Sequence, residues 1–257
     1  MAELEAALRK RLGLGGRAFV PYVTGGLPGV DAALLRDLQE TGADAVEVGI
    51  PFSDPVMDGG VIQESSRLAL EAGATPASIL GTIQEAALDV PVAVMTYVNP
   101  VYRSGYDAFL TAAEDAGVAA AIVPDLPIDE ADGWIDACHE HGVASVQLAA
   151  PGTSADRLAR IAAASQGFVY CVATYGVTGA RESVAGTASE LVERLRPLTD
   201  LPLLVGVGVG TPQQATQVAS FADGAIVGSA LMSRLLEWGR DGLIDSARAF
   251  RAALPLS

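Results

Sequence analysis

The chain has 257 residues, half of them apolar, and a formal charge of −15, because 31 acidic residues outnumber 16 basic ones. This length and apolar content allow a full hydrophobic core, in one domain or in a tightly packed pair. The acidic surface argues against nucleic acid and anionic membranes as partners. Any anionic ligand must therefore be held locally, by backbone amides or helix ends.

The N-terminus and the two cysteines indicate a compartment. The stretch from Met1 to Arg11 is a charged helical sequence without a long apolar region, so we expect no signal peptide. The longest apolar runs, such as residues 118–124, are too short to span a bilayer. Cys138 and Cys171 offer no disulfide framework and are expected to be small buried side chains. These features predict a cytoplasmic protein.

Short β-branched runs alternate with helical stretches rich in alanine and leucine along the whole chain. Several of the runs are continuously apolar, which is typical of strands covered on both faces in a parallel sheet. The predicted strands are 18–23, 44–50, 92–97, 119–123, 144–148, 167–172, 203–206 and 224–227. The predicted helices are 31–41, 62–71, 76–87, 106–116, 129–141, 154–164, 183–195, 212–219, 229–237 and 243–252.

This alternation predicts an α/β fold, a (β/α)8 TIM barrel with an extra N-terminal helix, in which residues 1–257 form a single domain. A doubly wound open sheet is the alternative. It would require a glycine fingerprint after its first strand, and Gly25-Gly26-Leu27-Pro28 does not supply one. Active sites of barrels lie at the C-terminal ends of the strands. That rule predicts one shared rim for Glu47, Asp58, Tyr97, Asn99, Asp125 and Tyr170.

An acidic side chain, Glu47, stands inside the apolar strand Val46–Ile50. Burying a polar group without a partner costs roughly 2–7 kcal/mol even when the group is neutral. A desolvated Glu has a raised pKa and can transfer protons near neutral pH. Asp58 follows on the next loop, and two carboxylates in different settings suit a divided acid–base task. A structural role for Glu47, paired with an Arg or a Tyr hydroxyl, is the alternative.

Three glycine-bearing segments after the sixth, seventh and eighth strands predict an anion site. They are Gly176–Gly179, Gly206–Gly210 and Gly228-Ser229. Glycine lets backbone N–H groups approach a ligand closely, and the helix that Ser229 opens would present free N–H groups. Barrel phosphate sites are commonly built from the loops after strands seven and eight. The alternative is that these glycines only permit turns, and 206–210 lacks the spacing of a dinucleotide fingerprint.

Other conspicuous residues point to ordinary structural roles. Helix positions two apart face different directions, so His139 and His141 cannot share a metal on one face, and we expect a solvated helix end and no metal site. These are also the only histidines, which excludes a zinc site built from three histidines. Trp134 and Trp238 lie among apolar neighbours and are expected to pack in the core. Asp54 fits a turn as well as it fits catalysis.

The motifs resemble those of one family. The segment from Glu47 to Pro55, followed by Asp58-Gly59 and Ile62-Gln63, is similar to the signature of the tryptophan synthase α subunit. The Glu47 signature is highly specific, whereas the glycine segments alone are not. Further segments occur in the family's order and spacing, namely Pro21–Thr24, Met95–Pro100, Pro124–Pro127, Gly176–Gly179 and Gly228-Ser229. The resemblance implies a lyase of tryptophan biosynthesis that cleaves indole-3-glycerol phosphate to indole and glyceraldehyde 3-phosphate.

The resemblance also implies roles for individual residues. Glu47 would give a proton to indole C3 and take one from the substrate hydroxyl, while ionised Asp58 would accept the indole N–H. No metal or organic cofactor is required for these steps. Substrate contacts are implied at Tyr22, Tyr97, Tyr170 and Thr178, and an apolar slot for indole at Ile62, Met95, Ile122 and Ile226. Phosphate contacts are implied at Gly179, Gly208, Gly228 and Ser229.

A tryptophan synthase β subunit is the implied partner, in a heterotetramer of two α and two β subunits. Three positions depart from the family pattern. Leu27 stands where many members have Asp, Gly60 where they have Pro, and Thr174 where they have Arg. A free-standing lyase that releases indole is therefore a second interpretation. A non-catalytic allosteric activator of a β subunit is a third, and the presence of both Glu47 and Asp58 speaks against it.

Overall fold

The computed structural model describes residues 3–173 and 184–254 of the chain. Within these ranges eight parallel strands close into a barrel, in which each strand pairs with the next and β8 pairs with β1. The predicted (β/α)8 barrel is therefore confirmed. The strands are β1 (Ala18–Thr24), β2 (Val46–Gly49), β3 (Val92–Met95), β4 (Val118–Ile122), β5 (Ala144–Ala149), β6 (Val169–Val172), β7 (Leu203–Gly206) and β8 (Gly224–Val227).

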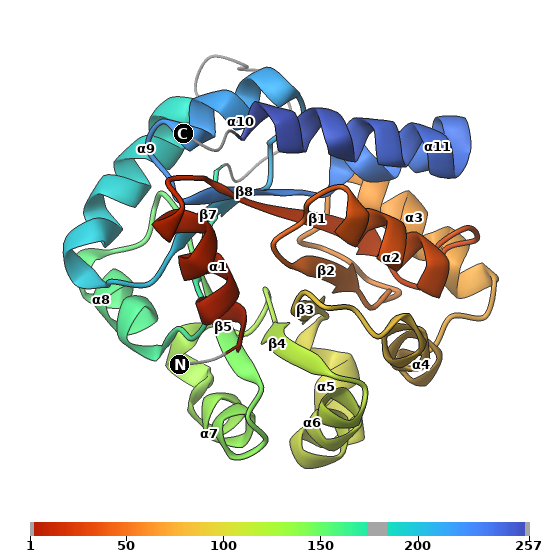
Figure 1. Cartoon of the computed structure of the whole chain (residues 1–257). Helices are drawn as coiled ribbons and strands as arrows, with labels where there is room; N and C mark the ends of the chain where they lie inside the picture. Colours follow the sequence, from red (N-terminus) through yellow and green to blue (C-terminus); the bar gives the residue numbers. More distant parts are fainter. Residues whose placement is uncertain (1–2, 174–183, 255–257) are drawn as a thin grey trace.

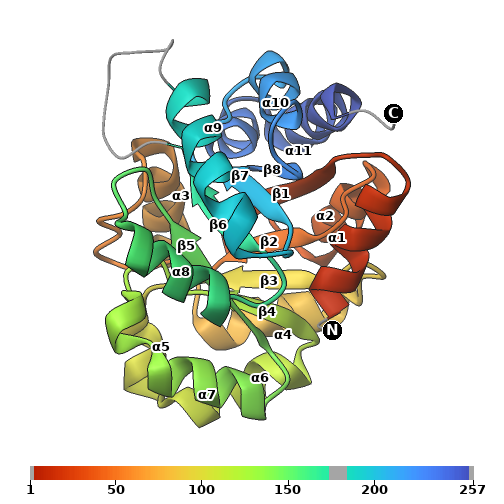
Figure 2. The same cartoon turned by 90° about the vertical axis from the view of Figure 1, so that its left-hand side faces the viewer.

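The helices surround the barrel, except that α1 (Glu3–Gly13) lies across its opening (Figure 1). The side view shows the helices packed along the outside of the strands (Figure 2). The surrounding helices and 3-10 turns are α2 (Ala32–Glu40), α3 (Gly60–Glu71), α4 (Pro76–Ala86), α5 (Val98–Ser104), α6 (Tyr106–Asp115), η1 (Ile128–Glu130), α7 (Asp132–Glu140), α8 (Ala155–Ala164), α9 (Val184–Leu195), η2 (Arg196–Leu198), α10 (Pro212–Ala219) and α11 (Ser229–Ala253).

The continuously apolar strands are explained by two separate layers of packing. One set of strand side chains faces the helices, and the alternate set fills the barrel interior. Ile122 and Ile226 belong to the interior set. Leu4 and Leu8 of α1 are fully buried against that same set, so the extra N-terminal helix closes the interior with its apolar face.

Several predicted elements differ from the structure. Strand β3 ends at Met95, and Tyr97, which was expected to end it, is instead the N-cap of the short, unpredicted helix α5, which has Pro100 in its first turn, where proline is tolerated. The helix predicted over 129–141 is divided into η1 and α7. The two helices predicted near the C-terminus form one continuous element, α11, with non-helical backbone angles at Gly239. The predicted interruption between the two helices is therefore present, although Gly239 alone departs from helical backbone angles.

The environments of the tryptophans and cysteines test the packing predictions. Trp134 is 2 % exposed and both cysteines are buried, as expected. Trp238 is 62 % exposed, so its predicted place in the core is wrong. It stands directly before the break at Gly239, and the Arg234 guanidinium lies 4.3 Å from its ring centroid. A cationic partner, rather than apolar neighbours, covers this ring.

The end of the barrel near α1 is fixed by a charged cluster. Asp44, just before β2, accepts hydrogen bonds from Arg11 Nε at 2.6 Å, Arg251 Nη1 at 3.0 Å and the Phe19 backbone N–H at 2.9 Å. This carboxylate therefore ties α1, β1 and α11 to the start of β2. In the described part of the chain, none of the helices combines the length and apolarity needed to cross a bilayer.

Candidate active site

Glu47 lies in β2 and is 1 % exposed. Neither of its carboxyl oxygens has a hydrogen-bond partner among the residues that the structure describes. The alternative of a structural acid paired with an Arg or a Tyr hydroxyl therefore has no support in these residues. Burial raises the pKa of Glu47 to about 8, and the nearby charge of Asp58 adds to the rise. At neutral pH this side chain is mainly a proton donor.

Asp58 lies on the loop between β2 and α3 and is half-buried. Its backbone N–H bonds to the Pro55 carbonyl at 3.1 Å, and Gln63 Nε2 donates to the Asp58 carbonyl at 2.8 Å. Burial raises the pKa of Asp58 to about 6, while hydrogen bonding by Tyr97 lowers it. Asp58 is therefore mainly ionised at pH 7, when Glu47 is mainly protonated. These different pKa values are compatible with a division of the acid–base task between the two acids.

Two buried tyrosines share the environment of these acids. The charges of Glu47 and Asp58 both contribute to raising the pKa of Tyr22 in β1 and of Tyr170 in β6, although burial is the larger cause. Each tyrosine lies against the last glycine of a neighbouring strand. An added Cβ at Gly49 would collide with the Tyr22 hydroxyl, and one at Gly206 with the Tyr170 hydroxyl. Glycine at both strand ends therefore makes room for a phenol.

Tyr97 does not end β3 as predicted. It is the N-cap residue of α5, is 4 % exposed, and receives the Met57 backbone N–H on its hydroxyl oxygen at 2.9 Å. Its ring lies 5.3 Å from that of Phe52, between centroids. Asp125, after β4, accepts the Val98 backbone N–H at 2.8 Å. The loops after β2, β3 and β4 are thus connected at the rim, as the barrel rule predicted.

The apolar residues of the predicted indole slot fall into two groups. Ile122 and Ile226 lie in the interior cluster with Tyr170, and Met95 packs against that cluster. Ile62 of α3 belongs to the larger cluster between strands and helices, together with Tyr22. Asn99, also predicted at the rim, is exposed in α5.

The glycine loops of the second half are only partly described. Gly176, Thr178 and Gly179 lie outside the described residues. In the loop after β7, Gly208 has φ +105° and Val207 has φ +58°, which is the left-handed region that a β-branched residue avoids. Gly228 is the N-cap residue of α11, and an added Cβ there would lie 3.3 Å from the Tyr22 ring. Ser229 begins the helix, as predicted.

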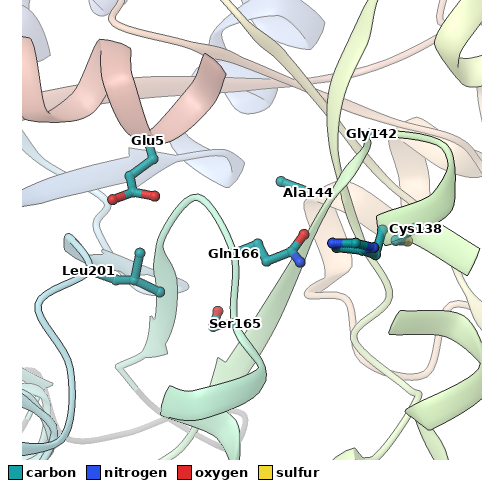
Figure 3. A pocket seen from close by; sticks show the side chains of 8 residues that line it. Glu5, Cys138, Gly142, Ala144, Ser165, Gln166 and Leu201 are labelled. Atoms are coloured by element: carbon teal, nitrogen blue, oxygen red, sulfur yellow. The ribbon is translucent and has the colours of Figure 1, made fainter. Parts of the chain in front are cut away.

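A cavity of about 420 Å³ lies at the opposite end of the strands, beneath α1 (Figure 3). Glu5, Cys138 and Gln166 are among the residues that line it. Two of its polar groups have partners in the fold, since the Arg9 guanidinium donates to Glu5 and the Gln166 side-chain oxygen accepts the Ser145 N–H. No predicted site residue lines this cavity. Within residues 3–173 and 184–254, no cluster of His, Cys, Asp and Glu suits a metal ion.

Comparison with known proteins identifies the family. The family model described as tryptophan synthase alpha chain matches residues 9–251. The chain belongs to the tryptophan synthase alpha chain family. Its alpha-chain relative from Streptomyces coelicolor is 46 % identical over 237 residues, covering 91 % of this chain and 86 % of the relative. The alpha chain of Picosynechococcus is 41 % identical over 240 residues, which is 91 % of each chain.

Solved structures agree with the assignment to the tryptophan synthase alpha chain family. A chain of Mycobacterium tuberculosis tryptophan synthase superposes with a TM-score of 0.90 at 39 % identity, covering 98 % of both chains. The alpha subunit of the Legionella pneumophila enzyme superposes with a TM-score of 0.89 at 32 % identity, also covering 98 % of both chains. The similarity therefore extends over nearly the whole chain.

The structure adds site features that the sequence pattern did not single out. Thr24 is fully buried at the end of β1, and its hydroxyl lies 3.3 Å from that of Tyr22. A polar residue ending an otherwise apolar strand was the available signal. Of the three departures from the family pattern, Leu27 is buried in the core, Gly60 is the first residue of α3, and Thr174 lies outside the described residues. Leu27 therefore contributes to packing within this chain.

Proposed function

We propose that this chain cleaves indole-3-glycerol phosphate to indole and glyceraldehyde 3-phosphate, as the α subunit of a tryptophan synthase. The observation that carries the proposal is the buried Glu47 carboxyl, which lacks a hydrogen-bond partner in the described chain and lies within the electrostatic influence of Asp58. Folding alone gives no reason to retain such a group. A proton-transfer step at neutral pH gives one, because the pKa of Glu47 is raised to about 8.

The proposed mechanism divides the proton transfers between the two acids. Protonated Glu47 delivers a proton to indole C3, and Asp58 accepts the indole N–H and stabilises the cation that develops on the ring. The resulting Glu47 carboxylate then removes the proton of the side-chain hydroxyl, and the carbon–carbon bond breaks. Indole leaves with its C3 proton, and the side chain leaves as the aldehyde. Glu47 ends the cycle protonated, so the residues named here require no further acid.

For substrate binding we propose two surfaces at the same rim. Tyr22, Tyr97 and Tyr170 contact the substrate, and Thr178 would join them from outside the described residues. The flat indole ring would lie among Ile62, Met95, Ile122 and Ile226, all of which are buried or partly buried. Phosphate would be held by backbone amides at Gly179, Gly208, Gly228 and Ser229. The start of α11 supports this placement, because a helix N-terminus favours an anion even in a protein with a charge of −15.

The partner and the cellular compartment follow from the same family. We propose that the chain binds a tryptophan synthase β subunit in a heterotetramer in the cytoplasm. Leu27, which departs from the family's Asp, is buried in the core of this chain. The pair Glu47 and Asp58 disfavours a purely allosteric activator.

Release of indole from indole-3-glycerol phosphate by the purified chain, alone and with saturating β subunit, tests these proposals. We expect slow turnover alone and a rise of about 5–150-fold with the partner. Full activity that the β subunit leaves unchanged would establish the free-standing lyase. Absence of indole in both assays would refute the lyase function.

A further inference from the structure

Asp125 lies at the rim, and the proposed mechanism assigns it no task. It follows β4 and is half-buried, and its carboxylate accepts the backbone N–H of Val98 at 2.8 Å. Val98 is the first residue of α5, whose N-cap residue, Tyr97, makes no side-chain capping bond. Asp125 therefore supplies from another loop the acceptor that the cap position lacks. This bond fixes the backbone immediately after Tyr97.

Tyr97 in turn contacts the loop that carries Asp58. Its hydroxyl oxygen accepts the backbone N–H of Met57, the residue before Asp58, at 2.9 Å, and hydrogen bonding by Tyr97 lowers the pKa of Asp58. The Phe52 ring lies 5.3 Å from the Tyr97 ring, so the phenol is held on its apolar side as well. Because a hydroxyl has one proton, accepting from Met57 leaves that proton for the carboxylate. The position of Tyr97 thus affects both the backbone next to Asp58 and the pKa of the Asp58 carboxyl.

We propose that Asp125 is a positioning residue that acts on Asp58 through Tyr97. The inference rests on the proposed lyase function and extends it to a residue after a third strand. A carboxylate suits this position better than a neutral acceptor, because a charge-assisted hydrogen bond is about twice as strong and the start of a helix favours negative charge. Burial raises the pKa of Tyr97, and the charge of Asp125 adds a small part to that rise.

The titratable groups around Asp58 are Glu47, Tyr22, Tyr97 and Tyr170, which act on one another in the same environment. Substituting Asp125 leaves all four in place. Loss of the Tyr97 bond removes an interaction that favours ionised Asp58, so the pKa of Asp58 must rise. The reaction needs this carboxylate ionised, and the acid limb of the activity profile should move to higher pH.

The test compares Asp125→Ala, Asp125→Asn and Tyr97→Phe in the full-length protein. We expect kcat to fall by between about tenfold and 100-fold in Asp125→Ala with a smaller change in KM, because displaced catalytic groups cost this much. In ¹³C NMR titrations the Asp58 pKa should rise by roughly half to one unit in Asp125→Ala, and less in Asp125→Asn, which keeps an acceptor. Asp156→Ala, an exposed acid in the first turn of α8, is the matched control and should change neither value.

A double-mutant cycle separates positioning from general stability. If Asp125 acts through the Tyr97 hydroxyl, Asp125→Ala should have little further effect on kcat or on the Asp58 pKa once Tyr97→Phe is present. Additive effects, or an Asp58 pKa that stays unchanged in the variants, would refute the inference. If Asp125→Ala fails to fold, the graded shift in Asp125→Asn decides in the same way. An inactive wild type would refute the lyase function instead, and the NMR titration would still test the positioning role.

Discussion

Two buried carboxyl groups, Asp44 just before β2 and Glu47 within it, stand three residues apart in the chain, and their surroundings are opposite. Asp44 has two arginines and a backbone N–H as partners. Glu47, within β2, has no hydrogen-bond partner among the described residues. At one end of the barrel, the buried acid Asp44 therefore has hydrogen-bond partners and connects the elements that carry them. The other end leaves its acid available for a substrate, and burial of an acid alone does not reveal which role it has.

The largest expected effect is the loss of activity at the unpaired acid. Glu47→Gln keeps the size of the side chain and removes its titration, so turnover should fall by about 10²–10⁴-fold. Indole release measured under saturating substrate checks this. Asp44→Asn should retain near-normal turnover per folded molecule. Near-normal turnover in Glu47→Gln would remove the distinction between the two acids.

The second prediction concerns the stability that the paired acid, Asp44, contributes. Asp44→Asn leaves Arg11 and Arg251 without their carboxylate in a half-buried setting, and the free energy of unfolding should fall by about 2–4 kcal/mol. Urea denaturation at pH 7 measures the change. Asp37→Asn, which breaks the more exposed ion pair with Arg240, is the control and should cost less than about 1 kcal/mol. Equal costs for the two variants would show that the cluster at Asp44 adds no stability beyond a surface pair.

The pH dependence of the free energy of unfolding should also distinguish the two ends of the barrel. The folded-state pKa of Glu47 is about 8, above its usual value, so the unfolded chain binds fewer protons between about pH 4.5 and pH 8. Stability from this group is therefore lost as pH rises through that window, by on the order of 3 kcal/mol at pH 7. The free energy of unfolding of Glu47→Gln should fall less than that of the wild type between pH 5 and pH 8. Parallel curves for the two proteins would mean that Glu47 titrates normally.

The smallest expected effect lies at the strained loop after β7. Val207→Gly should relieve left-handed strain at φ +58° while increasing the entropy of the unfolded chain, so stability should rise by no more than about 1 kcal/mol. The looser loop should weaken binding of glycerol phosphate by a few fold, as measured by calorimetry. If the variant binds more tightly, the strained conformation does not favour the anion.

Much of this architecture was predictable from the sequence. Apolar runs at regular intervals predicted the barrel, because parallel strands must be covered on both faces. The Glu47 motif predicted the site, because a carboxylate within such a run has no structural purpose of its own. That glycine at the ends of β2 and β7 makes room for the Tyr22 and Tyr170 hydroxyls, at Gly49 and Gly206, was not predicted and became clear only from the structure.

Tertiary structure alone decided which acids are paired. Arg251 and Arg11 contact Asp44 from opposite ends of the chain, and no local sequence pattern predicts these two ion pairs. The bond from Val98 to Asp125, the exposed ring of Trp238 and the short helix α5 likewise depend on which loops meet after the barrel closes. Sequence periodicity determines which side of an element is buried, whereas closure of the barrel determines what each buried group meets there.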